Sequence, residues 1–152
     1  MIYLTPHFTL EELTASDTAD ELGISNAATP EVRDRLAQLA GKLEDIRSLL
    51  GAKPVMVSSG YRCPQLNKAI GGAETSAHLY GCAADFIVPE FGDPYKICCY
   101  LTQLEGFLYD QLINEEGGGA RWVHIGLAVT GEPRCNDLTI ASGVTKTGFY
   151  PV

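Results

Sequence analysis

Residues 76–88, SAHLYGCAADFIV, constrain the fold of this chain more than any other stretch. The run CAADFIV that follows Gly81 is short and apolar, and it predicts a buried strand. Glycine adopts turn conformations that other residues resist, so the chain is able to fold back at Gly81. We therefore expect His78 to lie over the strand that carries Asp85.

This pair of side chains indicates a metal site. Histidine nitrogen and carboxylate oxygen are both zinc ligands, but two ligands do not make a site. The best candidate for a third ligand is His124, which lies in a predicted strand at 121–129. Alternation along that strand places Trp122 and His124 on the same face.

Two other residues compete for the role of ligand. Cys82 follows His78 by four residues, although the intervening Gly81 disfavours the helix that would align this pair. A purely structural site that uses Cys82 therefore stays open as an alternative. His7 lies near the N-terminus, and we expect it to be exposed or structural rather than a ligand.

Composition limits the class of protein. The chain has 152 residues, 45% of them hydrophobic and 20% charged, which is typical of a globular domain. Its net charge of −8 argues against broad binding to nucleic acid or to anionic membranes. We find neither a signal peptide nor an apolar run that would span a bilayer, so we expect synthesis in the cytoplasm. Five cysteines without a repeating spacing favour free thiols in a reducing compartment.

The longest predicted helix begins at Pro30 and ends before Gly51. Thr29 precedes it as an N-cap, and proline is favoured in the first turn of a helix. Apolar side chains at spacings of three and four give this helix one apolar face, formed by Val32, Leu36, Leu39, Leu43, Ile46 and Leu50. We expect this face to lie in the core.

The other segments predict a mixture of strands and short helices. Strands are expected at 54–60, 82–88, within 107–115, at 121–129 and at 138–140, and helices at 66–70 and 95–104. We expect residues 1–29 to be irregular except for one helical turn at 8–13, and residues 117–119 to form a flexible loop. These patterns predict a single α+β domain with an N-terminal arm (1–28), a core (about 29–129) and a C-terminal tail (130–152).

Hydrolytic chemistry follows if the three ligands meet. Two histidines and one carboxylate leave a position on zinc for water, whose pKa the metal lowers to about 7. A carboxylate must then take the proton of that water, and Glu115 or Glu116 is suitably placed at the end of the neighbouring strand. Arg62 follows another strand and is suited to hold the carbonyl oxygen as it becomes an oxyanion.

Three segments resemble the D-alanyl-D-alanine carboxypeptidase family of zinc peptidases: residues 59–62 (SGYR), 76–85 (SAHLYGCAAD) and 122–124 (WVH). The family pattern is S-x-H-x-x-G-x-A-x-D, followed later by a strand that ends in W-H or W-x-H, and every fixed position of its first half is present. The opening FTLEEL at 8–13 and the helix after Thr29 are similar to the phage and prophage branch. The resemblance covers about residues 8–127.

The resemblance implies a role for each matching residue. His78, Asp85 and His124 would hold one zinc ion, Arg62 would bind the scissile carbonyl or its oxyanion, and Ser76 would help to orient the substrate. In many members the catalytic glutamate lies three residues before the last histidine, where this chain has Arg121. In the phage-like branch it instead closes a segment similar to residues 110–115, which favours Glu115 and leaves Glu116 as the alternative.

The resemblance also implies an architecture and an activity. We expect an antiparallel sheet with helices packed on one face and a zinc cleft on the other. The expected activity is hydrolysis of a peptide bond in peptidoglycan stem peptides, of the D,D-carboxypeptidase or the L-alanyl-D-glutamate endopeptidase type. We expect a monomeric phage or prophage enzyme, an endolysin or virion-associated lysin, that acts on the bacterial cell wall after its release. A zinc-containing binding module without catalysis, as in the related hedgehog signalling domains, and a structural phage component remain alternatives.

Overall fold

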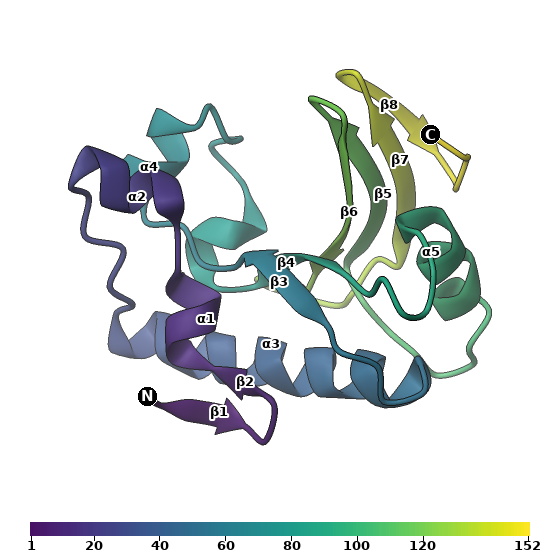
Figure 1. The fold of residues 1–152 in the computed structure, drawn as a ribbon, viewed down its shortest axis with the longest axis horizontal. Helices are drawn as coiled ribbons and strands as arrows, with labels where there is room; N and C mark the ends of the chain where they lie inside the picture. Colours follow the sequence, from purple (N-terminus) through teal and green to yellow (C-terminus); the bar gives the residue numbers. More distant parts are fainter.

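A computed structural model describes all residues from 1 to 152 and shows an α+β fold (Figure 1). A six-stranded sheet has the order β3-β4-β6-β5-β7-β8 and consists of β3 (Met56–Ser59), β4 (Ala83–Ile87), β5 (Gln111–Gly117), β6 (Ala120–Gly126), β7 (Asn136–Ala141) and β8 (Val144–Thr147). Strands β1 (Tyr3–Thr5) and β2 (Phe8–Thr9) form a second, two-stranded sheet. All neighbouring strands pair antiparallel except β5 and β7, which are parallel. The predicted antiparallel sheet is thus confirmed, with one parallel pairing.

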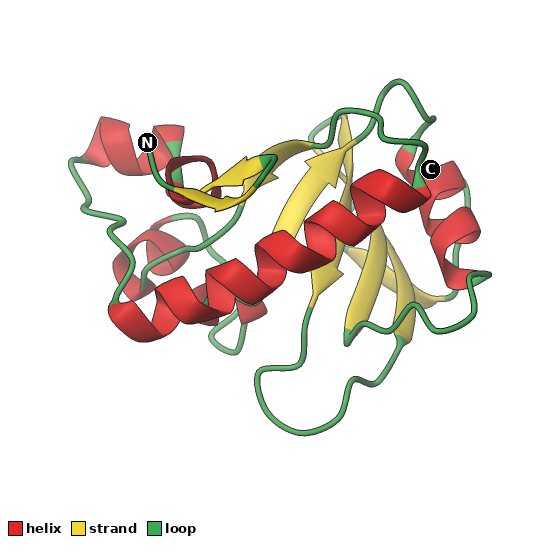
Figure 2. Ribbon diagram, turned by 90° about the horizontal axis from the view of Figure 1, so that it is seen from below, coloured by secondary structure: helices red, strands yellow, loops and turns green.

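Helices α3 (Pro30–Leu49) and α5 (Pro94–Thr102) cover one face of the large sheet, and the other helices lie beside it (Figure 1 and Figure 2). The other helices are α1 (Leu10–Thr14), α2 (Asp17–Leu22) and α4 (Pro64–Ala69), with one 3-10 turn, η1 (Ala77–Tyr80). Figure 2 shows α3 crossing the sheet, while α5 covers its far end. None of the helices combines the length and the apolar character needed to cross a bilayer.

Helix α3 supplies about a third of the core, more than any other element. The Thr29 side chain accepts a hydrogen bond from the backbone N–H of Val32, as expected of an N-cap. All six residues of the predicted apolar face are buried, and they pack with the apolar side chains of the sheet. Burial of a large apolar side chain contributes about 1.5–3 kcal/mol, so this face is a major part of the folding free energy.

Side-chain alternation gives the sheet two different faces. Phe86 of β4 and Val123 and Ile125 of β6 point into the core beneath α3. Their neighbours along the same strands, Asp85 and His124, therefore point to the opposite face. The pairing that buries the apolar side chains thus also gathers polar side chains on the side that no long helix covers.

The N-terminal arm is more ordered than predicted. Residues 1–29 contain β1, β2, α1 and α2, whereas we expected a single helical turn. Thr9 caps α1, and Ser16 caps α2, whose end is formed by Gly23 with φ of +66°. These elements are too short to show a hydrophobic period, so the sequence pattern did not reveal them.

The predicted flexible loop at 117–119 is instead a tight turn. Gly117 of β5 pairs with Ala120 of β6, and only Gly118 and Gly119 lie between them. Both glycines have positive φ, +58° and +83°, which is the conformation that a two-residue hairpin turn requires. The register of β5 against β6 is therefore fixed at this turn.

The C-terminal tail extends the sheet. We expected one short strand at 138–140, but the tail contains both β7 and β8. All of β8 is exposed, so it carries no apolar pattern that would have predicted a strand. Strand β7 pairs in parallel with β5, which is distant in sequence from it.

A hydrogen-bonded cluster fastens α5 to β7. The hydroxyl of Tyr109 donates to Oδ1 of Asp137 at 2.6 Å, and the hydroxyl of Thr102 donates to Oδ2 at 2.8 Å. Burial, together with the hydrogen bond to Asp137, raises the pKa of Tyr109 well above its ordinary value. The folded protein therefore holds this phenol in its neutral form.

We expect Tyr109→Phe to lower the free energy of unfolding by about 1.5–3 kcal/mol at neutral pH, because a hydrogen bond to a charged group is lost. The raised pKa contributes stability that is fully present below about pH 10, the ordinary tyrosine pKa, and is lost as pH rises above it. Urea denaturation at pH 7 and above pH 10 should show this alkaline loss in the wild type and in the exposed control Tyr3→Phe, but reduced in Tyr109→Phe. An unchanged alkaline loss in Tyr109→Phe would contradict the role of this cluster.

Candidate metal centre

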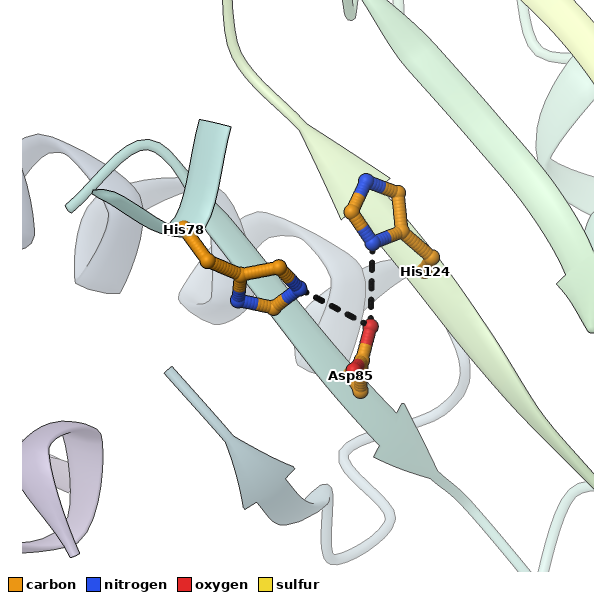
Figure 3. Close-up of side chains that lie close together, drawn as sticks. All are labelled: His78, Asp85 and His124. Carbon is orange, nitrogen blue, oxygen red and sulfur yellow. Dashed lines mark hydrogen bonds and ion pairs between the residues drawn. The ribbon is translucent and has the colours of Figure 1, made fainter. Parts of the chain in front are cut away.

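Three side chains point toward one another on the open face of the sheet: His78, Asp85 and His124 (Figure 3). Asp85 of β4 and His124 of β6 are register partners, and His78 lies in η1. The Oδ1 atom of Asp85 lies 3.0 Å from Nδ1 of His124 and 3.4 Å from Nε2 of His78. The structure therefore brings together the three residues that the sequence predicts as ligands.

Gly81 makes the approach of His78 to the strand possible. It ends η1 with φ of +73°, and the chain then enters β4. A Cβ atom at this position would come within 3.1 Å of both a side-chain and a backbone atom of Val32 in α3. Both the left-handed conformation and the close contact with α3 therefore require glycine, which confirms the predicted turn.

In the neutral His78 ring, Nε2 is an acceptor, and it faces another acceptor, Oδ1 of Asp85. Nδ1 lies 2.7 Å from the carbonyl oxygen of Gly60 and must carry the proton of that hydrogen bond. Burial lowers the pKa of His78, which favours the neutral ring with a lone pair on Nε2. A hydrogen bond from Nε2 to Asp85 would need the doubly protonated ring, which burial disfavours. The Nε2 lone pair thus faces a carboxylate oxygen, and a cation between them removes the repulsion.

The same cluster has the chemistry of a zinc site. Burial opposes the ionisation of Asp85, but the pKa of Asp85 stays below its usual range, and the hydrogen bond with Nδ1 of His124 is the largest contribution that lowers it. Neutral imidazole and ionised carboxylate are the forms that bind metal. In a tetrahedral zinc site, bonds of about 2.0–2.2 Å place ligand atoms about 3.3–3.6 Å apart. The three ligand atoms here lie within 4.8 Å of one another, so the residues fit one zinc ion.

The cluster lies in a cleft of about 880 Å³. The lining includes all six residues that the sequence predicts for the site: His78, Asp85, His124, Arg62, Ser76 and Glu115. Leu138 and Ile140 of β7 and Thr145 of β8 also line it, so the C-terminal tail forms part of its wall. The alternation of Leu138 and Ile140 predicts a strand there, but it does not indicate that this strand lies beside the site.

The strand register distinguishes Glu115 from Glu116. Glu115 is the partner of Trp122 and lines the cleft on the same face as His124. Glu116 is the partner of Arg121 on the alternate face and does not line the cleft. Burial, reinforced by the negative charge of Asp85, raises the pKa of Glu115. The indole Nε1 of Trp122 donates to its Oε2 atom at 3.0 Å.

Arg62 lies beside the cluster. Its Nη2 atom donates to Oγ of Ser76 at 3.2 Å, and its backbone N–H donates to the carbonyl of His78 at 3.0 Å. Burial lowers the pKa of Arg62 from its very high ordinary value, whereas the charges of Asp85 and Glu115 oppose this change. The side chain therefore stays cationic and faces the same cleft as the cluster.

The competing ligands lie elsewhere. Cys82 is buried and contributes no atom to the cluster, so the alternative site built on this thiol is not formed. His7 pairs with Glu44 of α3, with Nδ1 at 2.9 Å from Oε2, and it is partly exposed, as predicted. The sequence did not reveal the carbonyl of Gly60 as the partner of His78, because a backbone acceptor leaves no residue-specific signal.

Known proteins share sequence with this chain. The sequence model of the Peptidase M15 family matches residues 6–126. The Zinc D-Ala-D-Ala carboxypeptidase of Streptomyces albus G is 37% identical over 79 residues, which are 52% of this chain and 30% of that protein. The chain thus matches less than a third of the length of this relative.

We expect the chain to bind one zinc ion, measured by calorimetry on metal-free protein and by metal analysis. His78→Ala and His124→Ala should each weaken binding by more than about 100-fold, since even the loss of a partner behind a ligand costs 10–100-fold. His7→Ala and Cys82→Ala are the matched controls and should bind as the wild type does. Binding that depends on Cys82 but not on His124 would contradict the assignment.

Proposed function

Because the chain belongs to the Peptidase M15 family, we propose that it is a zinc-dependent peptidase that hydrolyses a peptide bond in the stem peptides of bacterial peptidoglycan. The observation that carries this proposal is the meeting of two histidines, one aspartate and one glutamate in a single cleft. The name of the Streptomyces albus G relative supports a D-Ala-D-Ala bond as the first substrate to test.

The three ligands would hold the zinc ion that hydrolysis requires. Zinc held by His78, Asp85 and His124 would supply an open position that lowers the pKa of water to about 7, and a charge that polarises the substrate carbonyl. The hydrogen bond to the carbonyl of Gly60 keeps Nε2 of His78 directed at the place where the metal would bind. Asp85 contributes a negative charge that the site needs only when a cation is bound.

Glu115 is the general base and acid in this proposal. It takes the proton of the attacking water and transfers it to the leaving amine, which departs as a neutral group. Burial raises the pKa of Glu115, and a carboxylate with a raised pKa is a better proton acceptor near neutral pH. Its place on β5, one strand away from His124, puts it on the same wall of the cleft as the ligands.

Arg62 and Ser76 bind and orient the substrate in this proposal. The guanidinium of Arg62 presents N–H donors to the carbonyl oxygen as negative charge develops there. Ser76 accepts a hydrogen bond from Arg62 and another from the backbone of His78, and so couples the cation to the ligand. Ser76 thereby orients both the arginine and the peptide that it binds.

We further propose a biological setting. The similarity of residues 8–13 to the phage and prophage branch supports an endolysin or a virion-associated lysin. In this setting a monomer is made in the cytoplasm and reaches the cell wall after its release. A D,D-carboxypeptidase and an L-alanyl-D-glutamate endopeptidase differ in the bond that they cut, so the products of digestion distinguish them.

We expect Glu115→Gln to lower kcat on muropeptides by about 10²–10⁴-fold without loss of zinc, since general acid–base catalysis contributes a factor of that size. Glu116→Gln is the matched control, one residue away on the other face, and should retain nearly full activity. Mass spectrometry of the products identifies the bond. A wild-type protein that holds zinc and cleaves no muropeptide would favour a binding module without catalysis.

A further inference from the structure

The indole of Trp122 holds one oxygen of Glu115. Nε1 donates to Oε2 at 3.0 Å, and the two residues are direct partners on β6 and β5. The other carboxylate oxygen, Oε1, has no hydrogen-bond partner within the protein. An indole N–H is a donor only, so Trp122 is able to hold the carboxylate but cannot take its proton.

Gly117 provides the space for this indole. A Cβ atom at Gly117 would lie 3.2 Å from Cη2 of Trp122, which is closer than ordinary van der Waals contact. The six-membered part of the ring therefore lies over the end of β5, two residues beyond Glu115. The two-residue turn at Gly118 and Gly119 sets the register that brings these groups together.

The hydrogen bond from Trp122 restricts the carboxylate that would accept the proton. A glutamate side chain has several rotatable bonds, and a general base must hold its oxygen within hydrogen-bond reach of the proton that it abstracts. A hydrogen bond to an ionised carboxylate is among the stronger ones in proteins, so it restricts the rotation of Glu115. The indole restrains Oε2, whereas Oε1 has no partner within the protein and is the less hindered acceptor.

We propose that Trp122 is a positioning residue of the peptidase, which fixes the Glu115 carboxylate so that Oε1 accepts the proton. Gly117 is part of this device because it leaves room for the indole. The inference rests on the proposed function of Glu115. A merely structural Trp122 would pack on Gly117 and stabilise the hairpin, without any specific effect on the chemical step.

Trp122 is the only tryptophan of the chain, which permits a sharp test. Replacing tryptophan throughout the protein with benzothienylalanine changes this one position, keeps the shape of the side chain and removes the N–H. Trp122→Phe is the genetic counterpart. With zinc content and KM within about twofold of the wild type, we expect kcat on a muropeptide to fall by about 10–100-fold, the range seen when a partner behind a catalytic group is lost.

A double-mutant comparison separates positioning from structure. Trp122→Phe should lower kcat in the wild type but have almost no further effect in the Glu115→Gln background, because the carboxylate that it positions is then absent. An equal loss in both backgrounds, or an unchanged kcat for both the analogue and Trp122→Phe, overturns the inference and leaves the proposed function standing. A wild type without turnover overturns the proposed function and the positioning role together. If Trp122→Phe does not fold, the analogue still decides the question.

Discussion

The rest of the site depends on the contact between Nε2 of His78 and Oδ1 of Asp85. The only N–H of the neutral His78 ring, at Nδ1, donates to the carbonyl oxygen of Gly60, and burial disfavours a second proton on the ring. The lone pair of Nε2 therefore faces the Asp85 carboxylate at 3.4 Å. Such a pair is unfavourable in a largely buried place unless a cation lies between the two atoms. His124 supplies a further nitrogen to the same point. The protein therefore builds a place for a metal before any metal binds.

The sheet places this local arrangement in a cleft. Its core face packs under α3, and that packing determines which side chains of β4, β5 and β6 point to the other side. The hairpin turn at Gly118 and Gly119 then places Glu115, rather than Glu116, beside the cluster. Two of the ligands, Asp85 and His124, and the carboxylate of Glu115 thus come from adjacent strands of one sheet, whereas the third ligand, His78, and Arg62 come from segments at its edge. Sites built on strands hold their geometry better than sites built on loops.

Local features of the site could be predicted from the residue pattern, which also named His124 as the best third ligand, whereas the preference for Glu115 came from the resemblance to a zinc peptidase family. The strand pairings that bring these residues together could not be predicted. His78, Gly81 and Asp85 are close along the chain, and the apolar face of α3 has a clear period, so both were predicted. The choice between Glu115 and Glu116 depends on register, which a shift of one residue reverses without any change in composition. The exposed strand β8 and the parallel pairing of β7 with β5 likewise leave no pattern in the sequence. The chemical roles of the site residues remain predictions.

The most direct test of the metal centre is a diffraction experiment at the zinc absorption edge, on crystals grown with zinc. The account predicts one anomalous peak about 2.0–2.2 Å from each of three atoms: Nε2 of His78, Oδ1 of Asp85 and Nδ1 of His124. It further predicts that the Nδ1 atom of His78 keeps its hydrogen bond to Gly60. A peak beside a cysteine sulfur, or no peak within the cluster, would contradict the central claim.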